Sequence, residues 1–301
     1  MYLIAYLYDL SKQDTETYMN ENIPAKNFVR LAIDEKAPDH STLTVFRERL
    51  IKRGKLEVFQ EMLKEIMFTA QERGIEFGKI QVIDSVHSVA NVNTAKDEQR
   101  KKKGKEARDP DASWGVKQQQ RIKVSEEKSK EQPLYFYGYK AHMSMNAGND
   151  LITSVEVSTG KEYDGHHFSS LVKADLEKEL PVETYAADRG YDDGENHYYL
   201  EKRGLHSAIH LKRNRTEKKD KNKQGWLRMK ESKEYRRGIK ERYKIERKFG
   251  EAKQWHGLGR CRYIGEMKYA FQVFLTVIVL NLKRIVKMIS GVGFKTQVAN
   301  A

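Results

Sequence analysis

The stretch KIQVID, residues 79–84, marks a change in the periodicity of the sequence. Upstream of it, apolar residues recur at helical spacing in YLIAYLYDL, NFVRLAI, STLTVFRERLIKRG and LEVFQEMLKEIMFTAQERG. KIQVID is instead short and rich in β-branched residues, follows Gly78 and ends in an aspartate, which is typical of a strand. The change predicts an all-helical unit over residues 1–75, followed by a second unit over residues 76–290 that contains a sheet.

Further strand patterns appear in PLYFYGYKAHMSM, in DLITSVEVST after the turn AGND, in VETYAA and in SAIHL, with helical patterns between and after them. The order strand, loop, strand, strand, helix, strand, helix, strand, helix predicts an α/β fold of the α+β type, a mixed sheet with helices packed on it. Between the first two strands, residues 96–130 are rich in Lys and Arg and lack apolar periodicity. We expect a basic loop there, flexible or ordered on binding.

The charge balance favours an anionic partner. Lys and Arg number 56 against 43 Asp and Glu, for a formal net charge of +13. The longest apolar run, residues 270–282, is too short and too interrupted by Gln, Thr and Asn to span a bilayer. The chain has a single cysteine, Cys261, which rules out an intrachain disulfide framework. Its N-terminus lacks the basic leader of a secretory signal. We therefore expect a cytoplasmic protein that binds nucleic acid and no membrane.

Three carboxylates are candidates for one site. Asp84 and Asp188 follow KIQVI and VETYAA at two predicted strand ends, where ligands gather, although either one alone could cap a turn or helix. Glu246 lies in KIERKFGEAK, with Arg242 and Gly250 among its helical neighbours, and could equally belong to a structural ion pair. If the two strands are adjacent and the helix packs across them, the three carboxylates converge and repel one another unless cations are bound.

Such a carboxylate group predicts Mg²⁺, with Mn²⁺ as a substitute, because hard divalent cations prefer oxygen ligands. Two ions about 3.5–4 Å apart can activate an attacking oxygen and stabilise the departing one at phosphorus. The basic tracts 96–130 and 212–237 would hold a polyanion through its phosphates. Candidate contacts with DNA in these tracts are Lys101, Lys102, Lys103, Arg213 and Arg215. Arg47 is another if the helix from Ser41 is a recognition helix, although a capped, solvated helix explains it equally well.

The chain resembles the DDE transposases of prokaryotic insertion sequences, which have a ribonuclease-H-like catalytic domain. The resemblance covers most of residues 36–285 and is carried by PDHSTLTVFRERL, VIDSVHSVANVN, DPDASWG, YFYGYKAHM, YAADRGYDDGENHYYLEKRG, ERYKIERKFGEAKQWHGLGRCRYIG and NLKRI. It implies that Asp84, Asp188 and Glu246 form the catalytic triad, and that residues 1–75 bind the ends of the element. It further implies hydrolytic cleavage of double-stranded DNA at those ends, followed by attack of the freed 3′-hydroxyl on target DNA.

The family's C-terminal signature is matched by Arg242 and Lys253, which makes both candidate contacts with DNA, whereas Ile239 stands where the signature has tyrosine. By analogy, a homodimer would form on DNA. Relatives usually carry further helical sequence upstream of the position of Met1, so the alternative is a shortened, catalytically inactive DNA-binding copy that acts as a regulator. A nuclease that cuts without joining is a third possibility.

Several other polar and aromatic residues have simpler interpretations. Asp192 and Asp193 precede a helix and are expected to cap it. His166 and His167 are expected in a loop or at a helix start. Tyr191 and Trp255 either pack or stack on bases.

Overall fold

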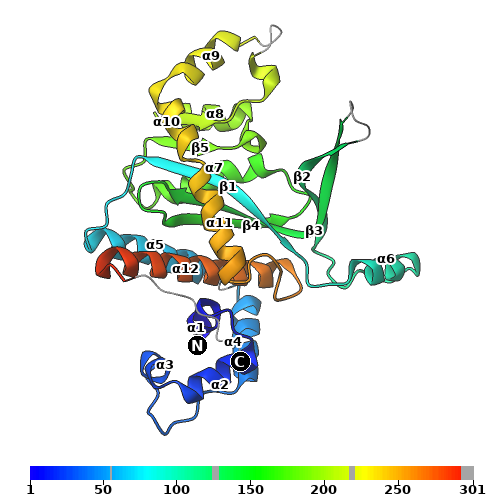
Figure 1. Cartoon of the computed structure of the whole chain (residues 1–301), viewed down its shortest axis with the longest axis vertical. Coiled ribbons are helices and arrows are strands. Elements are labelled where there is room, and N and C mark those ends of the chain that lie inside the picture. Colours follow the sequence, from blue (N-terminus) through cyan, green and yellow to red (C-terminus); the bar gives the residue numbers. More distant parts are fainter. Residues whose placement is uncertain (55, 124–128, 217–220, 293–301) are drawn as a thin grey trace.

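The computed structural model describes residues 1–54, 56–123, 129–216 and 221–292 (Figure 1). Its N-terminal part is helical, as expected. The five helices of this part are α1 (Tyr2–Leu7), α2 (Lys12–Glu21), α3 (Ile23–Phe28), α4 (His40–Lys52) and α5 (Glu57–Glu72). Asp39 caps α4 by accepting a hydrogen bond from the backbone N–H of Ser41, so the helix begins within one residue of the expected Ser41.

Within the described residues, six strands form one mixed sheet. They are β1 (Ile80–Val89), β2 (Ser113–Lys123), β3 (Ser129–Asn146), β4 (Ile152–Thr159), β5 (Thr184–Ala187) and β6 (His206–Ile209). Strand β3 pairs antiparallel with β1, β2 and β4, whereas β1 pairs parallel with β5, and β5 with β6. The order β4-β3-β1-β5-β6 is that of a ribonuclease-H-like fold, to which β2 is added. The expected mixed α/β fold is thus confirmed.

Helices cover both faces of the sheet. They bury the apolar residues that β1 carries on both of its sides. On one face, Ile83 packs with residues of α7 (Phe168–Leu176) and α8 (Gly194–Glu201). On the other, Val82 and Val86 belong to a core shared with α11 (Tyr243–Trp255) and α12 (Glu266–Ser290). Helices α1 and α5 add Tyr6 and Phe59 to that second core, so the N-terminal helices are anchored on α12. In Figure 1, α11 runs from α10 (Lys233–Glu241) towards α12.

The expectation of a loop over residues 96–130 was wrong where the chain is described. The segment contains α6 (Thr94–Lys102) and β2, whereas residues 124–128 lie outside the described part. Strand β2 is held by backbone pairing with β3, and its Trp114 and Val116 are exposed. Over residues 113–117, where the side chains of β2 are described, no apolar side chain is buried, so this part of the strand shows no apolar alternation from which it could be predicted.

Two expected boundaries also differ. Strand β1 does not end at Asp84 but pairs with β3 as far as Val89; only the parallel pairing with β5 stops at Ile83. The helix expected around Glu246 does not continue through Arg242, because α10 ends at Glu241 and α11 begins at Tyr243. Among the described helices, none is both long and apolar enough to cross a membrane.

Candidate active site

The two aspartates follow neighbouring positions of two parallel strands. Ile83 of β1 lies opposite Ala187 of β5, so Asp84 and Asp188 are the next residues along each chain. Since side chains alternate along a strand, Asp84 lies on the same face as Val82, the face that α10, α11 and α12 cover. Asp188 begins the short 3₁₀ helix η2 (Arg189–Tyr191), and its Oδ1 accepts a hydrogen bond of 2.7 Å from the N–H of Gly190.

The electrostatics of this pair favour a proton or a cation. Burial and, next to it, the carboxylate of Asp188 raise the pKa of Asp84 to about 7, against the opposing effects of the Ser85 N–H and the guanidinium of Arg242. The Ser85 N–H donates to Asp84 Oδ1 at 2.8 Å. A divalent cation would relieve the same repulsion as a proton does, because both bring positive charge to the two carboxylates.

A third aspartate, which was not predicted from the sequence, lies beside the pair. Asp164, in η1 (Asp164–His167), is among the charges that raise the pKa of Asp84. It accepts a hydrogen bond of 2.7 Å from Lys140 Nζ and one of 3.0 Å from Ser85 Oγ. Its signal in the sequence is weak, since YDGHH contains one aspartate before a helix.

Tyr191, which follows Asp188 in η2, is fully buried and packs against Phe168, so it does not stack on bases from this position.

Glu246 lies apart from the aspartates in this conformation. It is in the first turn of α11, its side chain is 64% exposed, and its Oε1 lies 3.9 Å from Arg242 Nη2. Arg242 is mostly buried at the junction of α10 and α11 and also acts on Asp84. Among the described residues, Asp84, Asp188 and Glu246 do not form a group whose ligand atoms all lie within 4.8 Å of one another. The structure thus brings the two aspartates together and relates Glu246 to them through Arg242.

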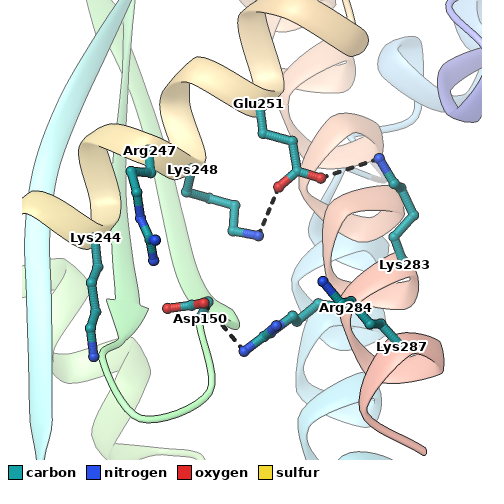
Figure 2. Close-up of a pocket in the computed structure, with 8 residues that line it drawn as sticks. All are labelled: Asp150, Lys244, Arg247, Lys248, Glu251, Lys283, Arg284 and Lys287. Atoms are coloured by element: carbon teal, nitrogen blue, oxygen red, sulfur yellow. Dashed lines mark hydrogen bonds and ion pairs between the residues drawn. The ribbon is translucent and has the colours of Figure 1, made fainter. Parts of the chain in front are cut away.

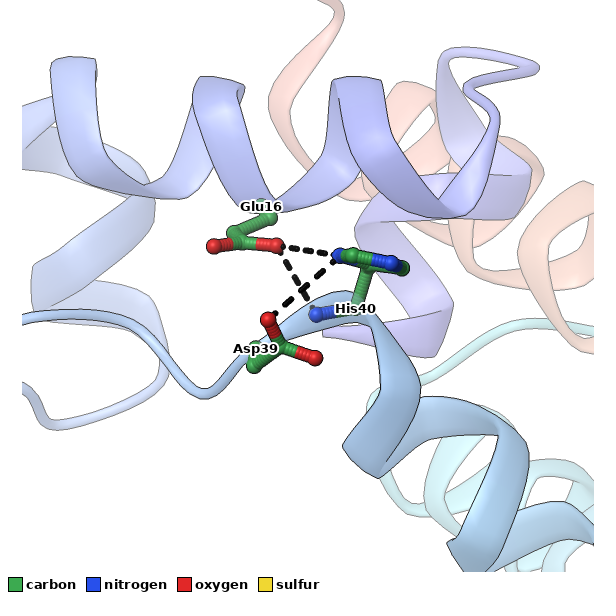
Figure 3. A group of neighbouring side chains, drawn as sticks. All are labelled: Glu16, Asp39 and His40. Carbon is green, nitrogen blue, oxygen red and sulfur yellow. Dashed lines mark hydrogen bonds and ion pairs between the residues drawn. The ribbon is translucent and has the colours of Figure 1, made fainter.

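In the described part of the chain, the group that does have such spacing is Glu16, Asp39 and His40 (Figure 3). Hydrogen bonds account for it without a metal. The backbone N–H of His40 donates to Glu16 Oε2 at 2.9 Å, and His40 Nδ1 lies 2.8 Å from the same oxygen. Since Asp39 is the cap of α4, the group joins α2 to the start of α4.

Some of the predicted contacts with DNA are accessible. Lys102 and Lys103 are exposed at the end of α6, and Arg213 is exposed in η3 (Arg213–Thr216). Lys253 is half-buried on α11, where burial and the charge of Lys117 lower its pKa. The side chain of Lys101 lies outside the described residues.

Two of the predicted contacts with DNA are engaged by other residues of the protein. Arg47 is 5% exposed, lies 2.9 Å from Glu48 and stacks at 3.9 Å over the ring of Tyr263. The prediction that Arg47 contacts DNA is therefore wrong for this conformation, because the guanidinium packs the N-terminal helices against the C-terminal part of the chain. Arg215 lies 3.3 Å from Asp192, which is a buried ion-pair partner and not, as expected, a helix cap.

Asp193 does cap α8, as expected, by accepting from the N–H of Glu195. His166 and His167 occupy η1 directly before α7, also as expected. His167 stacks on the buried His142 with 4.0 Å between ring centroids and lies 2.9 Å from Glu156, which explains its position more simply than a ligand role would.

Comparison with known proteins gives consistent results. Residues 79–282 match the family described as Transposase DDE domain, and residues 1–49 match one described as Transposase domain (DUF772). The chain is 28% identical over 196 residues to the transposase for insertion sequence element IS1106 of Neisseria meningitidis serogroup B. That match covers 59% of this chain and 62% of the relative, which is less than two thirds of the relative's length.

Among solved structures, the Mos1 transposase paired-end complex with left transposon end is similar over 82% of this chain and 80% of that chain, at 9% identity and a TM-score of 0.23. The Mos1 strand transfer complex is similar over 95% and 79%, at 10% identity and a TM-score of 0.24. Such low TM-scores carry no argument, so the assignment of the fold rests on the strand order.

Proposed function

Because the chain belongs to the transposase DDE domain family, we propose that it cleaves DNA at the ends of an insertion sequence and joins the freed ends to target DNA in a metal-dependent reaction. The observation that carries the proposal is the pair Asp84 and Asp188, which follow paired positions of parallel strands; burial and the charge of Asp188 together raise the pKa of Asp84 to about 7. The expected partners are the element ends and the target duplex, with a homodimer on DNA.

The donors of the site fit a hard divalent cation. Asp84 and Asp188 supply carboxylate oxygens, Asp164 lies beside them, and their mutual repulsion favours binding of positive charge. We propose that Asp84, Asp188 and Glu246 hold Mg²⁺ or Mn²⁺, with two ions at the site. When bound, such ions activate an attacking oxygen and stabilise the leaving oxygen at phosphorus.

The protein's own residues position the reaction. The two aspartates are fixed by the paired backbones of β1 and β5, whereas Glu246 is exposed and can change rotamer to approach them. Arg242, which lies near both Asp84 and Glu246, would contact a phosphate at the site, and Lys253 would contact the same strand further along α11. Lys102, Lys103 and Arg213 would hold more distant phosphates without reading sequence. We assign binding of the element ends to residues 1–75.

The test uses purified protein and a labelled duplex that carries the DNA flanking its own gene, with Mg²⁺ or Mn²⁺. Wild type is compared with Asp188→Asn and Glu246→Gln. Asp193→Asn is the matched control, because asparagine keeps the cap of α8. We expect wild type and control to cut at the element boundary and to join the freed ends to target DNA, and the two site variants to bind DNA without cutting it.

Other outcomes would identify other functions. Cleavage without joining would indicate a nuclease, and binding without cleavage by every variant would indicate a shortened regulatory copy. Normal cleavage by Glu246→Gln would remove that residue from the triad and leave Asp164 as the third carboxylate to test.

A further inference from the structure

A groove of about 400 Å³ lies between α11 and α12, beside the turn that joins β3 to β4 (Figure 2). Cations from both helices line it, with two carboxylates among them. Helix α11 contributes Lys244, Arg247, Lys248 and Glu251, α12 contributes Lys283, Arg284 and Lys287, and the turn contributes Asp150. The lining thus holds six positive and two negative side chains, an excess that favours an anionic ligand.

The groove and the candidate active site use opposite sides of α11. Successive residues of a helix are rotated by about 100°, so Lys248 and Lys244 lie about 160° from Glu246, whereas Lys253 lies within about 20° of it. A helix is about 10 Å across with its side chains, so α11 stands between the two places. An anion in the groove would therefore be different from one held at Glu246.

The cations of the groove are held in place by the protein. Glu251 accepts from Lys248 Nζ at 3.0 Å and from Lys283 Nζ at 3.2 Å. Arg284 Nη2 lies 3.3 Å from Asp150, and Lys244 Nζ donates to the carbonyl oxygen of Ala147 at 2.7 Å. Lys244 Nζ also pairs with Glu241, just outside the groove. These contacts fix four cations with three carboxylates, so the side chains are preorganised and their charge is not fully compensated.

The remaining two cations are available to a ligand. Arg247 and Lys287 are exposed, and within the described residues neither has a carboxylate partner. From Lys244 to Lys248 and from Lys283 to Lys287, each helix spans four residues, or about 6 Å. That length corresponds to about two phosphates of one DNA strand at about 3.4 Å each.

We propose that this groove binds the sugar–phosphate backbone of a second DNA segment, other than the one held at Asp84 and Asp188. The inference rests on the proposed function, because a strand-transfer reaction brings two DNA segments to one protein. A polyanion fits cations on two helices better than a single small anion does, since the lining contains little that would recognise a base or a sugar.

The test is a capture assay. A duplex is fixed to beads, protein is added, and retention of a second, labelled duplex is measured without divalent cations over a range of salt concentrations. The variant combines Arg247→Gln with Lys287→Gln. Its matched control combines Lys173→Gln with Lys202→Gln, two exposed lysines at the ends of α7 and α8 on the other face of the sheet.

We expect the groove variant to bind the first duplex as wild type does and to capture at least fivefold less of the second. The salt slope of capture, log of captured fraction against log of salt, should fall by about 2, one for each lost phosphate contact. The control should match wild type. A further variant with Arg247→Lys and Lys287→Arg keeps the charges and should restore capture.

Unchanged capture by the glutamine variant would overturn the proposal, as would failure of the charge-preserving variant to restore it. Binding of tripolyphosphate that the duplex cannot displace would show that the groove takes a small polyanion and not DNA. The metal-dependent cleavage assay with Asp188→Asn is read separately. If capture depends on the groove but wild type cuts no DNA, only the proposed function is refuted. If wild type cuts DNA but capture does not depend on the groove, only the proposal for the groove is refuted.

Discussion

Replacing Asp84 by asparagine should stabilise the metal-free protein, and increasingly so as the pH rises. The pKa of Asp84 is about 7 in the folded protein, whereas its ordinary value is 3.8. A raised pKa means that the folded state binds the proton more tightly than the unfolded chain does. The carboxyl group therefore costs no stability at low pH, and its cost grows until the pH passes about 7.

The size of the effect follows from the two pKa values. They differ by about 3 pH units, and each unit corresponds to about 1.4 kcal/mol, so the full cost is at most about 4 kcal/mol. Between pH 5 and pH 8.5 the cost should increase by about 2–3 kcal/mol. Asparagine has no charge to lose and keeps nearly the same volume, so the advantage of Asp84→Asn over wild type should grow by that amount.

The assay is urea unfolding followed by tryptophan fluorescence, in a chelating buffer at both pH values, with Asp193→Asn as the control. Subtraction of the control removes effects of net charge, because that variant also loses one carboxylate but from a helix cap. A free-energy difference that is the same at both pH values, or a variant that is less stable than wild type at pH 8.5, would refute the reasoning. Asp84 would then not be crowded by Asp188.

Three further predictions concern packing, a buried ion pair and DNA binding. Gly238→Ala should lower the free energy of unfolding by about 1–3 kcal/mol, because the new Cβ would lie 2.4 Å from an alanine Cβ on β6. Gly250→Ala places its Cβ in open space and should be neutral or stabilising by up to about 1 kcal/mol. Equal urea midpoints for the two variants would contradict this prediction. Asp192→Asn should cost about 3 kcal/mol in the same assay, since it takes the charged carboxylate from the buried His197 and the partly exposed Arg215; a loss below about 1 kcal/mol would show that these ion pairs are dispensable. Neutralising Lys102 and Lys103 should reduce the salt slope of duplex binding by about 2, measured by fluorescence anisotropy, and an unchanged slope would place both outside the interface.

The parts of the fold that could be predicted from the sequence are those whose pattern of apolar residues shows which faces of an element are buried. KIQVI and VETYAA are apolar on both faces, which is typical of strands inside a sheet, and they are indeed β1 and β5. Asp188 follows the second strand as expected. The adjacency of Asp84 and Asp188 was a hypothesis on the sequence, and it follows in the structure from the parallel pairing.

The parts that could not be predicted depend on distant contacts. The residues next to Arg47 in the sequence do not indicate that it is buried. It is covered by Tyr263, which is more than 200 residues away along the chain. Asp164 gains its place beside Asp84 because Lys140 and Ser85, on two different strands, hold its two oxygens. These contacts are specified by the packing of the whole sheet, and no local pattern encodes them.

The position of Glu246 shows how the site is divided between rigid and adjustable parts. Backbone pairing fixes the two aspartates, whereas Glu246 depends on where α11 lies, and α11 follows α10 after the interruption at Arg242. Helix α10 is seated on β5 and β6 through Gly238, where any side chain would collide. Since α10 is so constrained, the proposed triad would be completed by rotation of the exposed Glu246 side chain together with release of Arg242, without displacement of α10 from the sheet. Arg242 would then exchange a carboxylate for a phosphate, which links assembly of the site to the arrival of DNA.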